Sequence, residues 1–272
     1  MDSFYLFLPS NVSDITERNT IANYVTHLPQ TMKLYGSWEV GISEILYTKT
    51  WFNIVEDEEV RLITEYKGIS TQSCPIPAGC YRDLTSVMIK LNECLNKLIS
   101  QFRVTKADGE TVSPVIRYTR DKQRIVMLPG KLQKNMIIPL LPQSLRAILG
   151  FDLYNDFDFD EETEIDGKLI KGACIVQRVV DISATIHAIY VYCDIVKSSV
   201  VGDSFSKLLR VVSVPNAGFG ETIQKIYDQP QFFPLEKKEF QTIEIDIKDD
   251  TGTTLKFDSG RVIIVLHFRK RE

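Results

Sequence analysis

Three histidines, His27, His187 and His267, are the candidates for the general base that a hydrolytic enzyme requires. All three lie in segments with the residue alternation of β-strands. None belongs to an HExxH or His-x-x-x-His pair, and the chain contains no CxxC, so the spacing of metal ligands is missing. We therefore expect no catalytic histidine, no metal site and no cofactor.

A Gly-Asp-Ser triplet at residues 202–204 resembles the nucleophile segment of one family of serine esterases. Those enzymes also carry an Asp three residues before the catalytic histidine. Here the residues at that position are Tyr24, Ala184 and Ile264, so the orienting carboxylate of a triad is missing. We interpret the triplet as a turn and expect a protein that is not an enzyme, with a hydrolase centred on Ser204 as the least favoured alternative.

An acidic segment, residues 152–166, contains eight Asp and Glu residues, and Asp alternates with Phe from Asp156 to Asp160, as in a calcium loop. A calcium loop also needs Gly at its sixth position and Glu at its twelfth, where this chain has Glu161 and Gly167. We therefore expect an exposed acidic loop or edge ribbon here. A GxxxxGKS/T phosphate loop is also missing from the sequence.

Six Lys and Arg residues occur together with a single acid, Asp121, in the middle of the chain. Four of them form a candidate partner-facing basic patch: Arg117, Arg120, Lys122 and Arg124. A solvated face is the first interpretation, contact with an acidic partner the second and nucleic acid the third. The net charge of −4 argues against general nucleic-acid binding, which draws on neutralised phosphates.

The composition is that of a soluble globular protein, with 44% apolar and 25% charged residues. The longest apolar runs, such as Val262–Leu266, are much shorter than the roughly 20 residues that span a membrane. The N-terminus lacks the basic segment of a signal peptide. The five cysteines are irregularly spaced, which indicates buried thiols in a reducing compartment rather than disulfides. We expect a soluble, unsecreted protein.

Strand patterns dominate both ends of the chain. Ile243, Ile245 and Ile247 alternate with charged residues, which is the period of a strand with one buried face. Further strands are expected at residues 4–8, 21–28, 37–47, 175–182, 186–196, 208–214, 253–257 and 262–268. After Ser43 and Glu44 the apolar phase slips by one residue, which predicts a β-bulge or bend.

A mixed segment separates these strands. Residues 60–66 alternate once more, and then apolar residues recur at intervals of three and four over residues 84–102. This period predicts an amphipathic helix, which Asp83 would cap. Two strands, at 115–118 and 124–128, and a short helix between Pro142 and Gly150 are expected to follow.

Strands at both ends around a mixed segment predict a mostly β fold, an antiparallel β-sandwich interrupted by an α+β insertion. The expected division is residues 1–70 for the first part of the sandwich, 71–171 for the insertion and 172–272 for the second part. Two consecutive domains would leave the first strands with too few partners to close a sheet.

Short blocks along the chain resemble the penton (minor capsid) proteins of Polinton/Maverick elements and adintoviruses. The first blocks are Phe4–Pro9 with Ser10-Asn11, Trp38-Glu39-Val40-Gly41 and Glu44-Ile45. The middle blocks are the helix ending in Asn92 and Leu149-Gly150-Phe151. The last blocks are Tyr190–Asp194, Val201-Gly202-Asp203, Leu208–Val212, Gly252, Phe257, Gly260 and Leu266-His267-Phe268. Together they span nearly the whole chain.

The resemblance implies a single jelly-roll antiparallel β-sandwich with an inserted α+β segment. It implies a structural capsid protein of the virion, assembled inside the host cell, whose homopentamers (pentons) occupy the icosahedral five-fold vertices. Its partners would be copies of itself, a double jelly-roll major capsid protein and, through the insertion, a host receptor. The last step is an analogy at the level of the fold.

The residues alone leave a different class of function open, a receptor- or carbohydrate-binding β-sandwich module. In such a module the inserted segment would form the recognition surface, and the isolated monomer would bind glycans. A ring of about five subunits would instead favour the capsid protein, because closed rings form through one repeated heterologous interface.

Overall fold

The structure is a computed structural model of the chain. It describes residues 3–11, 19–64, 70–101, 111–119, 124–132, 135–151, 162–165, 168–171, 173–176, 178–183 and 186–271. The chain divides into two compact units, one formed by residues 1–52 and 186–272 and the other by residues 53–185. Each unit has a hydrophobic core. Within the described ranges, no helix is long and apolar enough to cross a membrane.

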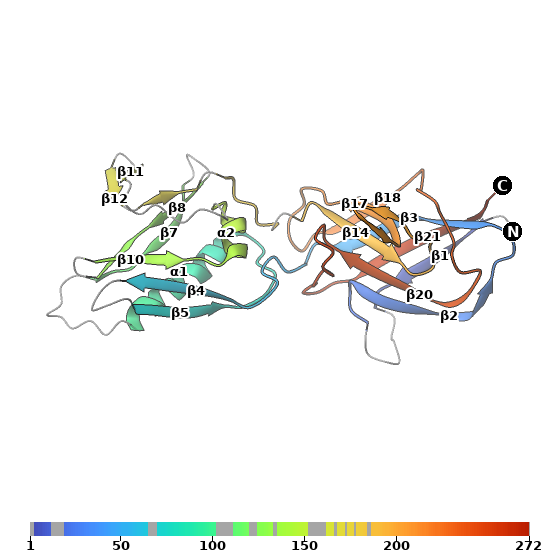
Figure 1. The fold of residues 1–272 in the computed structure, drawn as a ribbon, viewed down its shortest axis with the longest axis horizontal. Helices are drawn as coiled ribbons and strands as arrows, with labels where there is room; N and C mark the ends of the chain where they lie inside the picture. Colours follow the sequence, from blue (N-terminus) through green and yellow to red (C-terminus); the bar gives the residue numbers. More distant parts are fainter. Residues whose placement is uncertain are drawn as a thin grey trace. The chain divides into compact units, whose positions relative to one another are not determined.

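Two antiparallel sheets form the first unit (Figure 1). One has the strand order β1-β21-β3-β18, with the short β19 also paired to β3, and the other has the order β17-β14-β20-β2. The strands are β1 (Ser3–Pro9), β2 (Asn23–Lys33), β3 (Trp38–Thr48), β14 (Ala188–Cys193), β17 (Leu208–Ser213), β18 (Thr222–Ile226), β19 (Phe233–Pro234), β20 (Glu239–Lys248) and β21 (Val262–Lys270). A small hairpin joins β15 (Ser199–Val201) to β16 (Ser204–Ser206).

The pairing of these strands is that of a jelly roll. The two four-stranded orders together contain eight strands, which are counted here from one to eight along the chain. The first pairs with the eighth (β1 with β21) and the second with the seventh (β2 with β20). The third pairs with the sixth (β3 with β18) and the fourth with the fifth (β14 with β17). A ribbon of antiparallel pairs that folds over into two facing sheets has this connectivity. The predicted mostly β fold, a single jelly-roll sandwich with an inserted α+β segment, is confirmed.

The core of the first unit lies between its two sheets. Ile243, Ile245 and Ile247 of β20 are fully buried, as their alternation predicts, and each buried side chain of this size contributes about 1.5–3 kcal/mol. A hydrogen bond also joins the sheets, because the Tyr24 hydroxyl on β2 donates to the Leu8 carbonyl oxygen on β1 at 2.9 Å. The sheets are therefore tied by a polar contact inside an apolar core.

The predicted bulge lies in β3. Along the pair of β21 and β3, Val265 lies opposite Glu44 while the next residue, Leu266, lies opposite Ile42, so Ser43 is the extra residue. The Ser43 hydroxyl donates to the Val265 carbonyl oxygen at 3.1 Å, which satisfies an acceptor beside the bulge. The phase slip in the sequence thus predicts the bulge correctly.

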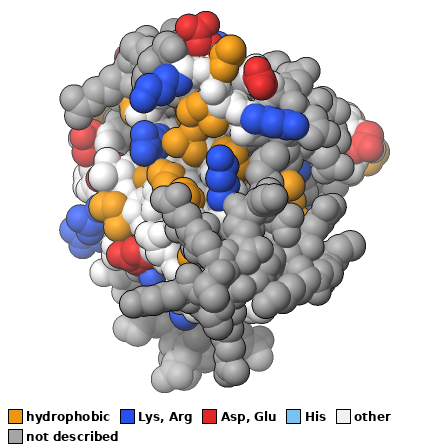
Figure 2. All heavy atoms as spheres, turned by 90° about the vertical axis from the view of Figure 1, so that its left-hand side faces the viewer, with side chains coloured by type: hydrophobic (Ala, Val, Ile, Leu, Met, Phe, Trp, Pro, Cys, Tyr) orange, Lys and Arg blue, Asp and Glu red, His pale blue; other side chains and the backbone are white. Residues whose placement is uncertain are grey.

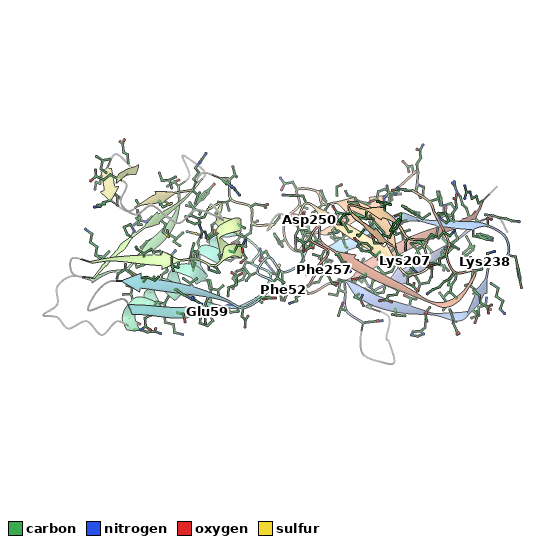
Figure 3. All side chains as sticks on the ribbon, in the orientation of Figure 1. Phe52, Glu59, Lys207, Lys238, Asp250 and Phe257 are labelled. Atoms are coloured by element: carbon green, nitrogen blue, oxygen red, sulfur yellow. The ribbon has the colours of Figure 1, made fainter. Side chains whose placement is uncertain are left out.

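The second unit is inserted between the third and fourth strands of the jelly roll, β3 and β14. Before the insertion, Trp51 forms a bridge with Phe257, and the Phe52 amide donates to the Lys256 carbonyl oxygen at 2.7 Å. Figure 3 shows Phe52 and Phe257 beside each other. The last residues of the jelly roll before the insertion are therefore held by its C-terminal segment.

The second unit combines helices with short strands. Its described sheets have the orders β5-β4-β10-β9-β6, β13-β8-β7 and β11-β12. The strands are β4 (Glu58–Thr64), β5 (Ser70–Ile76), β6 (Thr111–Val112), β7 (Val115–Thr119), β8 (Arg124–Leu128), β9 (Gly130–Leu132), β10 (Asn135–Leu140), β11 (Glu162–Ile165), β12 (Lys168–Lys171) and β13 (Cys174–Ile175). The helices are α1 (Leu84–Gln101) and α2 (Gln143–Leu149). Helix α1 packs against β4, β5 and β7 with the buried residues Val87, Leu91, Leu95 and Leu98.

Both helix termini predicted from the sequence are present. A carboxylate oxygen of Asp83 accepts hydrogen bonds from the amide and the hydroxyl of Ser86, at 2.7 and 2.8 Å, and so caps α1. These hydrogen bonds lower the pKa of Asp83. Gly150 follows α2 with φ = 83°, and its amide donates back to the last turn, which is the usual role of Gly after a helix.

The units divide at positions that differ from the expected limits of the insertion, 71 and 171. Strand β4, assigned from its alternation to the first part of the sandwich, pairs with β5 and β10 in the second unit. Among the described residues of the segment expected as one strand, 175, 176 and 178–182, the only strand residue is the end of β13. Alternation identifies a strand with one buried face but does not specify which sheet buries that face, so the pattern of β4 fits either unit.

Candidate interaction surfaces

Ser204 lies in the tight hairpin of β15 and β16. Val201 pairs with Ser204, and only Gly202 and Asp203 lie between them. Gly202 has φ = 61°, in the left-handed region that favours Gly. The Ser204 hydroxyl donates to the Val201 carbonyl oxygen at 3.2 Å. The prediction of a turn is confirmed, and this hydroxyl stabilises its own hairpin.

The three histidines lie apart in the fold, on β2, just before β14 and on β21. His267 stacks on Tyr5 at 4.4 Å between ring centres and meets the Phe232 ring edge-on at 5.4 Å. Burial, followed by the charge of Arg269, lowers the pKa of His267. The imidazole thus belongs to an aromatic cluster on the outer side of the jelly roll.

Metal ligands do not gather in the part of the chain that the structure describes, where no three His, Cys, Asp or Glu side chains could hold an ion. Of the acidic segment, residues 162–165 form β11, and the alternating Asp156–Asp160 stretch lies outside the described residues. Cys74, Cys94 and Cys193 are buried thiols, as expected. Burial raises the pKa of Cys94 and of Cys193 to about 12.

The predicted basic patch divides into residues in different environments. Arg117 on β7 is exposed, and Arg124 on β8 is half-buried and donates to the Val176 carbonyl oxygen at 2.9 Å. Arg120 and Lys122 lie outside the described residues. Arg117 therefore remains the exposed cation of the patch on which a binding surface can be argued from the structure.

Apolar side chains on the outer side of one jelly-roll sheet are the feature that the sequence analysis missed. Tyr5 and Phe7 on β1 are 53% and 68% exposed, and Ile226, on β18 at the opposite edge of the sheet, is 67% exposed. Between the edges, Ile263 and Leu46 lie opposite each other and alternate with buried neighbours. These five residues are called the apolar outer face below.

A signal for this face is present in the sequence of β1. A strand that buries one side only should alternate apolar and polar residues. Residues 4–8 are all aromatic or aliphatic, so the outward half of the strand is apolar as well. Such a run indicates that both sides of a strand are covered, either by the same chain or by another one.

The fold is similar to those of two solved structures. Over 99% of this chain and 100% of the other, the structure is similar to the crystal structure of the mavirus penton protein, with a TM-score of 0.50 and 13% sequence identity. The chain has the fold of that penton protein. A chain of the Sputnik virophage cryo-EM structure is also similar over 99% of this chain and 98% of its own length, with a TM-score of 0.51 and 11% identity.

These similarities include the jelly roll and the insertion, because nearly all of both chains is aligned. No protein-family model and no curated protein sequence matches the chain. At these identities the similarity concerns the fold. The sequence blocks resemble penton proteins, and by a separate route the structure has the fold of one such protein.

Proposed function

We propose that this chain is a structural capsid protein that forms homopentamers at the five-fold vertices of an icosahedral virion. One observation carries the proposal: the mavirus penton protein and this chain share one fold from end to end, insertion included. The virion location and a double jelly-roll major capsid protein as neighbour belong to the same proposal. The insertion is then the part of the subunit available for a receptor.

The apolar outer face supplies the physical basis for assembly. Monomeric proteins rarely expose a large contiguous apolar patch, and such patches mark protein interfaces. Tyr5 and Phe7 lie at one edge of the sheet and Ile226 at the other edge. A ring needs two different patches on each subunit, since the interface that closes it is heterologous. Apolar residues at opposite edges meet this requirement.

The oligomeric state of the full chain tests the proposal. We expect light scattering and electron microscopy to show rings of about five subunits, alone or with the shell protein. Phe7→Ser should weaken the subunit contact by about ten- to a hundredfold, since a buried Phe contributes about 1.5–3 kcal/mol. Val179→Ser in the insertion is the control, because Val179 is 73% exposed, close to the 68% of Phe7, and lies outside the apolar outer face.

Two outcomes would contradict this function. A chain that stays monomeric at high concentration, both alone and with a double jelly-roll shell protein, is not a vertex subunit. Equal loss of assembly in Phe7→Ser and Val179→Ser would contradict the apolar outer face as the subunit contact.

A further inference from the structure

A groove in the second unit combines an apolar floor with a basic rim. Its volume is about 590 Å³. The groove is lined by Val112, Ser113, Val115, Arg117, Leu128, Pro129, Lys131, Leu169, Ile170 and Lys171. Figure 2 shows a face of the molecule on which hydrophobic side chains gather among Lys and Arg side chains. Val112 and Leu169 are 42% and 69% exposed, so part of the apolar surface is open to solvent.

The charges along this groove have one sign. Arg117, Lys131 and Lys171 are exposed, and the lining residues include no carboxylate. Among the described residues, the side chains of these three cations form no hydrogen bond and no ion pair. Glu162 on β11 lies opposite Lys171 in the register, outside the lining, whereas Arg117 lies opposite Val126. Lys131 lies opposite Met136 and Val112. Arg117 and Lys131 are therefore the cations without an acid across the sheet.

Three strand edges border the groove. In the described sheets β6 pairs only with β9, β7 only with β8 and β12 only with β11. Of the lining residues, Val112 belongs to β6 and Ser113 follows this strand. Arg117 belongs to β7 and Leu169 to β12. An edge strand presents unpaired amide and carbonyl groups, to which an extended peptide can add as a further strand. The Ser113 hydroxyl beside them is buried and has no hydrogen-bond partner in the described part of the chain.

We propose that this groove binds an extended acidic peptide segment of another protein by strand addition. The backbone of the ligand pairs with a free strand edge, and its carboxylates interact with Arg117 and Lys131. Side chains two residues apart on a strand share one side, as Val115 and Arg117 do on β7 and Leu169 and Lys171 do on β12. The side of the ligand that faces the groove would therefore carry both carboxylates and aliphatic groups, with the aliphatic groups against Val115, Leu128 and Leu169.

The lining favours a peptide over other polyanions. Sugars and single-stranded nucleic acids bind proteins largely through stacking on aromatic rings, together with hydrogen bonds to polar groups. The described lining has no aromatic ring and one hydroxyl, that of Ser113, whereas its aliphatic floor suits Val, Leu or Ile side chains. A carboxylate-bearing peptide with aliphatic residues matches both the rim and the floor.

The test uses the full chain, in whatever oligomeric state it adopts, and three fluorescent or immobilised probes. The first is a peptide of about eight residues, the length of an ordinary strand, in which Val and Glu take turns at every second position and Thr fills the positions between them. The second is the same peptide with alternate backbone amides methylated, which keeps the charges and removes the donors that pair with a strand edge. The third is heparin, a sulfated polysaccharide.

We expect the unmodified peptide to bind and the methylated peptide to bind at least about tenfold more weakly, the loss from one or two hydrogen bonds. Arg117→Ala and Lys131→Ala together should weaken binding about tenfold or more, and raised salt should weaken it as well. Lys168→Ala is the control, since Lys168 on β12 is an exposed cation outside the lining.

Three results would overturn the proposal. Equal binding of methylated and unmodified peptides would exclude strand addition. An equal effect of Lys168→Ala and of the double variant would exclude a specific groove. Binding of heparin but not of the peptide would assign the basic rim to a polysaccharide. Each readout is independent of ring formation, so failure here leaves the proposed vertex function untouched.

Discussion

The side-chain amide of Asn53 donates a hydrogen bond of 2.9 Å to the carbonyl oxygen of Ile182, across 129 residues of sequence. The same amide donates to the Tyr81 carbonyl oxygen at 2.9 Å, and its oxygen accepts from the Tyr81 amide at 3.0 Å. Asn53 is 1% exposed and is the first residue of the second unit. One buried side chain therefore fastens the beginning of this unit to a segment near its end.

Replacement of Asn53 by Ala should destabilise the second unit selectively. Three hydrogen bonds are lost and their partners stay buried, which costs about 3 kcal/mol at about 1 kcal/mol for each bond. Native-state hydrogen exchange should show protection in α1 falling about 100-fold, with β20 of the jelly roll unchanged. Asn53→Asp, which cannot donate, should be at least as damaging. An equal fall in hydrogen-exchange protection in both units would contradict the local role of Asn53.

Two buried tyrosines should respond oppositely to the loss of the hydroxyl. Tyr24→Phe removes the hydrogen bond to the Leu8 carbonyl oxygen and should lower the free energy of unfolding by about 1–2 kcal/mol. The Tyr47 hydroxyl is buried without a hydrogen-bond partner in the described part of the chain. Tyr47→Phe should therefore leave the stability unchanged or raise it. Urea unfolding of the two variants measures the difference, and similar losses would contradict it.

Alkaline pH should destabilise the jelly roll through Tyr47. Burial, and then the neighbouring Tyr227, raise the pKa of Tyr47 to about 12 from its ordinary value of 10.0. The neutral phenol is thus favoured in the folded state, and its contribution is complete below pH 10 and lost as pH rises toward about 12. Unfolding free energies over that range should fall less steeply in Tyr47→Phe than in the unchanged protein. The same pH dependence of the unfolding free energy in both proteins would contradict Tyr47 as the cause of the alkaline destabilisation.

Two glycines with the same backbone conformation should differ in their tolerance of Ala. Gly150 and Gly252 have φ of 83° and 85°, so each Ala variant loses about 1–2 kcal/mol for the left-handed conformation. A Cβ at Gly150 would also lie 2.5 Å from the Arg178 carbonyl oxygen, whereas nothing lies within 4 Å at Gly252. Gly150→Ala should cost about 1–3 kcal/mol more, by chemical denaturation. Equal losses of stability in the two variants would contradict this prediction, because residues 178–179 would then shift away from the new Cβ without a cost in free energy.

Features that depend on neighbouring residues could be predicted from the sequence. The alternation in β20, the bulge at Ser43, the cap at Asp83 and the Gly150 terminus each follow from a few adjacent side chains. The physical causes, one-sided burial and unpaired helix amides, act over one turn or a few strand residues. For that reason these predictions agree with the structure.

Features that depend on distant partners could not be predicted. The sequence does not show that β1 pairs with β21 or that β4 belongs to the second unit, because strand registers are set by the whole sheet. Arg124 belonged to the predicted basic patch, yet it donates to Val176, 52 residues away. Phe7 could be assigned to a strand, but its exposure depends on which neighbours cover β1.

The position of the insertion, between β3 and β14, has a consequence for how such a subunit can change over time. The described residues at the two crossings, 52, 53 and 186, lie outside the strands. No strand of the jelly roll therefore has to shift its register when the inserted unit is lengthened, shortened or exchanged. The jelly roll and the inserted unit can then accumulate substitutions under separate selection. For the proposed vertex subunit, a new attachment surface could therefore evolve while the geometry of the shell stays the same.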